Sequence, residues 1–169
     1  MLELKKSNYE DELEEYIFTK KLPKEETGFF NYFYDLTKEE FREKCLSKHQ
    51  YEDQLKEIDA NGTMPMTTFY LWLNGHIIGI FTCIHKLTEQ AKNRNGHIAY
   101  AILEEYRHKG YASTGLAMVI EEMKDKIYED YIYMHADIKS PYSIKVMLDN
   151  DAEIIKKDQT GYYTKIKIR

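Results

Sequence analysis

The stretch "EEYRHKGYASTG", residues 104–115, contains residue types that suit the binding of an anion. Arg107 and Lys109 carry positive charge, and Gly110 has no side chain to keep a ligand away from the backbone. At the start of a helix several backbone amides have no partner, and the helix dipole adds positive potential. The stretch lacks the Gly-Lys-Ser/Thr of a nucleotide P-loop and the three glycines of a dinucleotide fingerprint. Taken alone it also fits a tight turn with solvated basic side chains.

The elements predicted around this stretch favour phosphate binding over a plain turn. "HIAYAIL", residues 97–103, reads as a strand, and apolar residues between Ala112 and Ile127 recur at spacings of three and four, which predicts a helix with one buried face. "YIYMHADI", residues 131–138, predicts a second strand. Strand, helix and strand within about 40 residues indicate a right-handed βαβ crossover. The anion would then bind where the helix begins.

The first 60 residues are predicted to be mostly helical. A charged helix spans Tyr9 to Lys21, and "TKEE", Thr37 to Glu40, is a capping-box pattern that starts a second helix. That second helix carries Phe41, Cys45 and His49 at spacings of four. We expect His49, the polar member of this stripe, at the surface or at its boundary.

The later part of the chain predicts two hairpins. Asn74-Gly75 between two β-rich runs is the strongest short hairpin signal, so residues 68–85 should pair antiparallel. A short helix over 140–150 and a hairpin turning at Thr160-Gly161 close the chain. The sequence contains no internal repeat and no linker-like segment. We therefore predict a single α+β domain over residues 1–169, with a mixed sheet and one central βαβ unit.

Composition limits the classes of partner. The net charge of −5 disfavours a general nucleic-acid binder, which needs a basic face. Cys45 and Cys83 are isolated, so neither a metal site nor a redox motif is predicted. The N-terminus is acidic without an apolar run, and no segment approaches the length of a membrane span. We therefore expect a cytoplasmic protein that binds neither membrane nor nucleic acid.

Two longer stretches resemble one family, the GNAT acyl-CoA-dependent N-acetyltransferases. "AYAILEEYRHKGYASTGLAMVIEEM" resembles the signature strand, [Q/R]-x-x-G-x-[G/A], helix. "IKSPYSIKVMLDNDAEII" is similar to the N-x-x-S-x-x-V-x-x-x-N-G segment of a bacterial branch, with Ser143 and Asn150 matching, Ser140 in place of asparagine and Asp151 in place of glycine. The resemblance covers residues 66–168. Residues 1–60 match poorly, as the variable part that shapes the acceptor site would.

The resemblance implies a fold and a cosubstrate. The fold would be a GNAT-like, mostly antiparallel twisted sheet, with splayed central parallel strands and flanking helices. Acetyl-CoA would lie in the gap between the splayed strands, its pantetheine arm pairing with residues 101–103 like an added strand and its pyrophosphate held by the amides of residues 108–113. The implied coenzyme-binding residues are Ala101, Ile102, Leu103, Arg107, His108, Lys109, Gly110, Tyr111, Ala112, Ser113 and, near the thioester, Ser143.

The resemblance also implies direct attack by an amine, without a covalent enzyme intermediate. The amine must lose a proton before it attacks, and His97 is our first choice as the base because a neutral imidazole accepts protons near pH 7. His85 and Glu104 are the alternatives, and a histidine near a strand end also often just bonds the backbone. For His135, packing in the core is the favoured interpretation, and a place on the acceptor side is the alternative. The acceptor would be a primary amine of a small molecule or peptide, and many relatives pair as homodimers.

One position departs from the family pattern. Many relatives have a proton-donating tyrosine seven residues after the asparagine, and counting from Ser140 this position is Met147. A second reading is therefore a non-catalytic GNAT-like protein that holds acyl-CoA as a sensor or serves in protein association.

Overall fold

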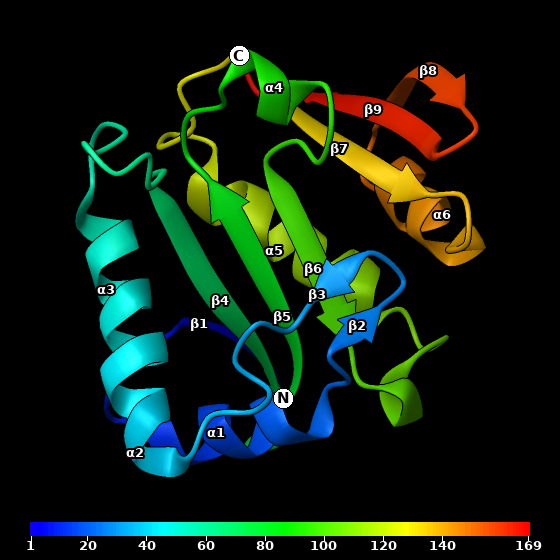
Figure 1. Cartoon of the computed structure of the whole chain (residues 1–169). Helices are drawn as coiled ribbons and strands as arrows, with labels where there is room; N and C mark the ends of the chain where they lie inside the picture. Colours follow the sequence, from blue (N-terminus) through cyan, green and yellow to red (C-terminus); the bar gives the residue numbers. More distant parts are fainter.

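The computed structural model describes residues 1–169. Seven strands form two antiparallel sheets that lie side by side (Figure 1). The four-stranded sheet has the order β1-β4-β5-β6 and the three-stranded sheet the order β7-β9-β8. Their bounds are β1 (Leu2–Lys6), β4 (Met66–Leu73), β5 (His76–Ile84), β6 (Ile98–Ile102), β7 (Tyr131–Asp137), β8 (Glu153–Asp158) and β9 (Gly161–Lys167).

Six helices and one small hairpin surround the sheets. A π-helical segment joins α2 to α3, and a single 3-10 turn follows β6. None of the helices is long and apolar enough to cross a membrane. The bounds are α1 (Glu12–Lys21), α2 (Lys38–Glu40), the π segment (Phe41–Leu46), α3 (Ser47–Gln54), α4 (Glu89–Lys92), the 3-10 turn (Glu104–Tyr106), α5 (Tyr111–Met123), α6 (Pro141–Leu148) and the hairpin strands β2 (Glu25–Glu26) and β3 (Phe29–Phe30).

Helices cover both faces of the four-stranded sheet. Alternation along β4 sends Phe69 and Leu71 into the main core with α5, and Tyr70 and Trp72 into a second cluster with Phe18 of α1. In Figure 1, α5 accordingly lies behind the sheet, while α1 and α3 lie on the other side and at its edge. This two-sided burial explains why β4 reads as an almost continuous apolar run.

Strands β6 and β7 meet at one end only. The His97 amide donates to the Tyr133 carbonyl at 2.6 Å, and Gly96 makes an isolated bridge with Met134. Beyond this point the two strands are not paired, and their arrows diverge in Figure 1. The fold predicted from the resemblance, a mostly antiparallel sheet with splayed central strands and flanking helices, is confirmed.

Several sequence-based predictions agree with the structure. The hairpin turns at Asn74 and Gly75, with φ of 50° and 86°. The capping box at Thr37 and Glu40 is formed by both of its hydrogen bonds. Helix α5 buries one face, the short helix forms as α6, and the last two strands pair as a hairpin.

Two predictions for the N-terminal part were wrong. It is not simply helical, because Leu2–Lys6 form β1, which pairs with Leu73–Phe69 of β4. His49 is not at the surface: it is 6% exposed, and its Nδ1 lies 2.9 Å from the Ser7 hydroxyl. The stripe on α3 faces inward because α3 packs on β4, and Ser7 at the end of β1 supplies the polar partner that lets a histidine be buried.

Candidate active site

The turn before α5 is open and its amides are unused. The Arg107 amide donates to the Glu104 carbonyl, and the Thr114 amide donates to the Gly110 carbonyl. The six amides between them, residues 108–113, donate to no acceptor in the protein. Gly110 is the N-cap in a left-handed conformation with φ of 83°, and a Cβ added there would meet no atom within 4 Å. The turn therefore presents a row of free donors at the positive end of a helix dipole.

A cavity of about 580 Å³ lies against this turn, and we call it the coenzyme cavity because the resemblance described above implies that the coenzyme binds here. Tyr100, Ala101 and Ile102 of β6 form one wall, and α6 forms the opposite wall. Its charged lining has three cations and two carboxylates: Arg107, Lys139 and Lys145 against Glu26 and Asp149. Shape and charge thus suit a phosphate-bearing ligand.

The basic side chains of the turn hold the turn itself. Arg107 Nε donates to the Ile102 carbonyl at 2.9 Å, and its guanidinium lies 3.0 Å from Glu26 of the β2–β3 hairpin. The Lys109 ammonium donates to the Glu105 carbonyl at 2.8 Å. Arg107 therefore ties the turn to β6 and to the hairpin, and the free donors of the site are main-chain amides.

One edge of β6 is free along the coenzyme cavity. Its odd-numbered residues pair with β5, because the Leu103 amide donates to Ile78 and the His97 carbonyl accepts from Ile84. By alternation, the amides of Tyr100 and Ile102 face the gap toward β7. An extended ligand can pair there as an extra strand. Leu103, by contrast, turns its amide to β5 and its side chain into the second core cluster.

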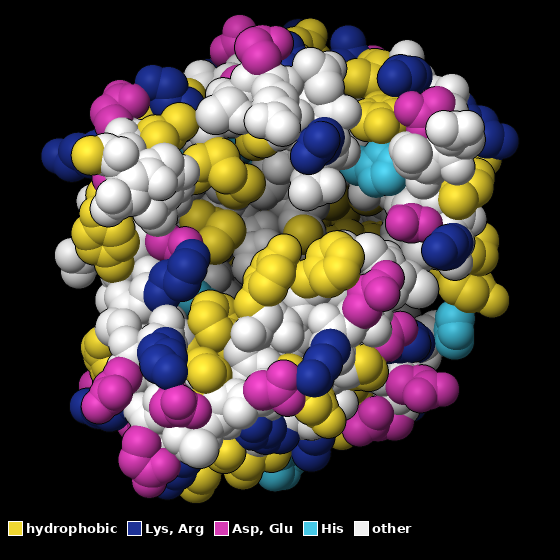
Figure 2. Space-filling model, in the orientation of Figure 1, with side chains coloured by type: hydrophobic (Ala, Val, Ile, Leu, Met, Phe, Trp, Pro, Cys, Tyr) yellow, Lys and Arg dark blue, Asp and Glu magenta, His cyan; other side chains and the backbone are white.

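A second cavity has a volume of about 560 Å³, and we call it the acceptor cavity because the resemblance implies that the N-terminal part of the chain, which lines it, shapes the acceptor site. Residues of α1, the β2–β3 hairpin, α3, β4, β5, β6 and β7 line it. Figure 2 shows this face of the molecule hollowed at its centre, with hydrophobic side chains on the rim. Thr27, Tyr100 and Ser143 line both cavities, so the two spaces meet between the hairpin, β6 and α6.

Tyr100 places a phenol at this junction. Its ring stacks on Phe81 with 5.3 Å between centroids, and its hydroxyl lies 3.5 Å from the Ser143 carbonyl as a long hydrogen-bond donor. The Ser140 and Ser143 hydroxyls are 2.7 Å apart beside it. Burial raises the pKa of Tyr100 to about 12, although the Ser143 contact opposes the shift. The phenol is therefore protonated at neutral pH and can donate a proton.

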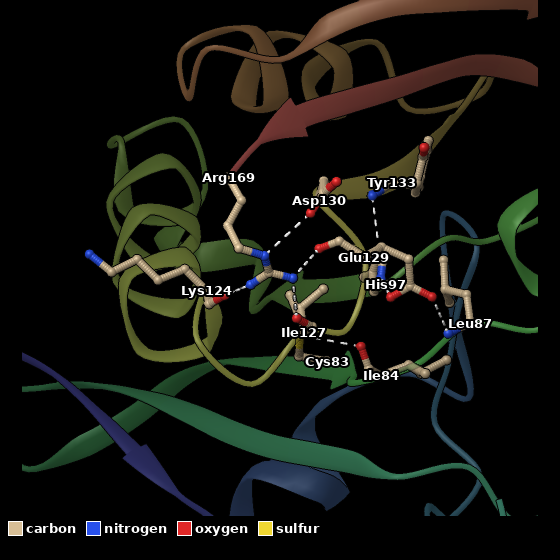
Figure 3. Close-up of polar contacts among 10 residues, drawn as sticks. All are labelled: Cys83, Ile84, Leu87, His97, Lys124, Ile127, Glu129, Asp130, Tyr133 and Arg169. Atoms are coloured by element: carbon tan, nitrogen blue, oxygen red, sulfur yellow. Dashed lines mark hydrogen bonds and ion pairs between the residues drawn. The ribbon is translucent and has the colours of Figure 1, made fainter. Parts of the chain in front are cut away.

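His97 lies outside both cavities and holds the two sheets together (Figure 3). Its Nδ1 accepts from the Tyr133 amide at 2.9 Å, which puts the proton on Nε2, 2.9 Å from a Glu129 oxygen. Burial lowers the pKa of His97, against the opposing pull of Glu129. With both ring nitrogens engaged and both of these cavities elsewhere, His97 has no free lone pair to offer an amine. These contacts argue for a structural role and against the role as base.

The other two sequence-based candidates for the base also lie outside both cavities. His85 Nε2 is 2.7 Å from the Thr67 hydroxyl, which in turn bonds Asp53, and burial lowers the pKa of His85. Glu104 is an exposed residue in the turn after β6. Met147, at the position of the missing tyrosine, is buried in the wall of the acceptor cavity.

The titratable groups that do line the acceptor cavity are different ones. Apart from the tyrosines, they are Glu25, Lys48, His49, Glu52, His135 and Asp137. His135 and Asp137 lie two apart on β7 and both line this cavity, so the favoured prediction that His135 packs in the core was wrong. Its Nε2 is 3.2 Å from the Thr160 hydroxyl, and burial lowers the pKa of His135, opposed by Asp137 and Asp158. Sequence reasoning missed Glu52 as a lining residue, because nothing in its charged helical segment predicts that its side chain is buried against this cavity.

Comparison with known families identifies the class of protein. Residues 30–148 match the family model described as Acetyltransferase (GNAT) family. Since the match spans more than half of the chain, the chain belongs to the GNAT family, and it is an acetyltransferase. Comparison with curated protein sequences gave no match.

Solved structures share the fold at low sequence identity. A GNAT-family acetyltransferase from Streptococcus pneumoniae superposes with a TM-score of 0.68 at 16% identity, with 100% of both chains covered. RimL, a ribosomal L7/L12 alpha-N-protein acetyltransferase in complex with coenzyme A, gives 0.67 at 12% identity, covering 97% of this chain and 90% of that chain. The microcin C7 self-immunity acetyltransferase MccE, in complex with acetyl-CoA and AMP, gives 0.63 at 13%, covering 98% and 90%.

Proposed function

We propose that this protein transfers an acetyl group from acetyl-CoA to a primary amine of a small molecule or peptide, by direct attack. The observation that carries the proposal is the row of six unused amides, residues 108–113, beside an open cavity. A diphosphate would satisfy these donors. The coenzyme A and acetyl-CoA complexes of RimL and MccE support the choice of cosubstrate.

The rest of the coenzyme, its pantetheine arm and its thioester, would lie along the coenzyme cavity. The free amides of Tyr100 and Ile102 would pair with the pantetheine arm. The thioester would then reach the junction of the cavities, beside Tyr100 and Ser143. We further propose that residues 1–169 act as one domain, because residues 18–52 supply much of the acceptor cavity and residues 66–147 the rest.

His135 in the acceptor cavity and Tyr100 at the junction can manage the two protons of the reaction. As the amine nitrogen bonds the acetyl carbon and the carbon–sulfur bond breaks, the nitrogen gives up a proton and the sulfur gains one. His135 is the lining group placed best to accept the first proton, because its pKa is lowered and its Nδ1 bonds no protein atom. Tyr100 is placed to donate the second proton. An amide of β6 would stabilise the oxyanion.

A second candidate function is acyl-CoA binding without catalysis. Met147 and Ser140 favour it, since both replace residues of the family pattern. Tyr100 at the junction favours catalysis, because it supplies a proton donor that Met147 cannot.

One experiment separates the candidates. Thermal unfolding with and without acetyl-CoA tests binding, because a ligand of the native state must raise the melting temperature. Release of the free thiol of coenzyme A with a panel of amines tests catalysis. No thermal shift would refute the coenzyme site. A shift without thiol release for any amine would leave the binding protein and reject the enzyme reaction.

A further inference from the structure

Two buried polar atoms, both of residues that line the acceptor cavity, have no partner in the protein. They are Glu52 Oε2 and Thr68 Oγ1, and they are the only buried side-chain nitrogen or oxygen atoms of the chain without one. Both residues are 3% exposed and both line this cavity. Leaving a buried polar group unpaired costs roughly 1–3 kcal/mol, and more for a charged group. Both atoms belong to residues that line the same cavity, and a ligand group that reaches them from it would satisfy them.

The two residues occupy the part of the cavity farthest along the sheet from β7. Glu52 lies on α3, which packs on β4, and Thr68 lies on β4 itself. In register, Thr68 is opposite Thr82 of β5, which is opposite Ala99 of β6, next to Tyr100. Two steps between neighbouring strands separate Thr68 from β6 by roughly 10 Å. A ligand that reaches both places is elongated.

Charge in this cavity selects the sign of the ligand. Three carboxylates line it, Glu25, Glu52 and Asp137, against the single ammonium of Lys48. Lys48 pairs with the other oxygen of Glu52, which leaves Oε2 as a free acceptor. This balance is the opposite of that in the coenzyme cavity, where cations exceed carboxylates.

The walls between the two ends are largely apolar. Aromatic side chains from the hairpin, α1, β4 and β6 surround the space: Phe18, Phe29, Phe30, Phe33, Tyr70 and Tyr100. Aromatic faces suit a methylene chain and attract a cation. Carboxylate, hydroxyl and aromatic walls together describe a site for an alkyl ammonium group.

We propose that Glu52 and Thr68 bind a second amino group of the acceptor, so that the acceptor is a diamine or polyamine whose far ammonium is held at α3 and β4 while its other amine reaches the junction. This inference rests on the proposed function, since it names the acceptor of the same reaction. Oε2 of Glu52 and the Thr68 hydroxyl each accept a hydrogen bond from the far ammonium.

The test compares a diamine with the monoamine of the same length. Calorimetry on the full chain, with and without coenzyme A, measures binding of octamethylenediamine and octylamine. The wild type should bind the diamine roughly ten- to hundredfold more tightly, the range expected for hydrogen bonds to a charged group. Shorter and longer diamines then define the spacing. Equal affinity for diamine and monoamine would overturn the proposal.

Two near-isosteric variants locate the effect. Glu52→Gln turns the free acceptor into an NH2 donor, so it should abolish the preference for the diamine. Thr68→Val replaces the unpaired hydroxyl by a methyl group, so it should weaken diamine binding several-fold while the melting temperature stays level or rises. Glu43→Gln, which changes an exposed carboxylate just before α3 that lines neither cavity, is the control and should change affinity less than about twofold.

The outcomes keep this inference apart from the proposed function. If acetyl-CoA does not raise the melting temperature of the wild type, the coenzyme site is rejected, whatever the affinities for the diamines are. A retained thermal shift with unchanged diamine preference in Glu52→Gln would reject the acceptor assignment alone. A sharp fall in the melting temperature of Thr68→Val would show that its hydroxyl serves the fold, and would also reject it.

Discussion

Substitution of Gly110 by leucine tests the coenzyme site with a matched control. Gly110 has φ of +83° and Gly62 has φ of +80°, and a Cβ added to either meets nothing within 4 Å. Each substitution therefore costs only the left-handed backbone penalty, about 1–2 kcal/mol. For a chain of this length, that lowers the melting temperature by roughly 2–8 °C in both variants. Gly110 borders the coenzyme cavity and Gly62 does not.

Acetyl-CoA should distinguish the two variants. At a concentration one hundred times the dissociation constant, a ligand adds about 2.7 kcal/mol, which raises the melting temperature by roughly 5–11 °C. Gly62→Leu should keep this rise in full. Gly110→Leu should lose it, because the new side chain extends from the turn whose amides are free.

The assay is thermal unfolding of three proteins with and without acetyl-CoA, at a concentration set from the wild-type affinity. If acetyl-CoA raises the melting temperature of Gly110→Leu as much as that of Gly62→Leu, the turn does not hold the diphosphate. If Gly110→Leu unfolds far below Gly62→Leu without ligand, its open surroundings have been misjudged and the comparison of affinities fails.

Three further substitutions test Tyr100 and His135, described above, and Glu15, a buried residue of α1. Burial raises the pKa of Glu15 to about 7, against a usual value near 4.5. The folded state then binds more protons than the unfolded chain between these values, so stability falls by about 3 kcal/mol as pH rises from 4.5 to 7. Glu15→Gln should remove this fall, as urea midpoints at both ends of the range will show; an unchanged slope contradicts the assignment. Tyr100→Phe should lower kcat roughly a hundredfold with acetyl-CoA affinity unchanged, and an unchanged kcat excludes Tyr100 as proton donor. Burial lowers the pKa of His135, so the acidic limb of kcat/KM should lie below pH 6.5 and vanish in His135→Gln; a limb that persists assigns it to another group.

Elements set by local signals were predictable from the sequence. Asn74-Gly75 permits the positive φ of a tight hairpin, and the stripe of α5 follows the helical repeat. Strand β1 was missed because its register depends on β4, more than sixty residues later, and because "LELKK" is short and charged. Its alternation of leucine with charged residues was the available signal.

The same division between local and distant signals holds for the candidate site. The open turn at Gly110 follows from a helix start and a glycine, which are neighbours in the chain. The partners of His97 are 32 and 36 residues away, so its engagement could not be read from its own segment. Burial of Glu52 likewise depends on packing against β4. Sequence reasoning therefore predicted the open turn with its free amides, while the binding of an anion there stays a prediction, and it failed to place the side chains of the acceptor cavity.

The narrowest approach of β6 to β7 lies at Gly96, where an added Cβ would stand 2.1 Å from the Tyr133 carbonyl oxygen. The two sheets thus form a wedge with its apex at a residue that borders neither cavity. Even a methyl group at the apex would force the strands apart and change the angle of the wedge over its whole length. Coenzyme and acceptor would both lose their fit from one remote position, which makes Gly96 intolerant of substitution without any contact to a substrate.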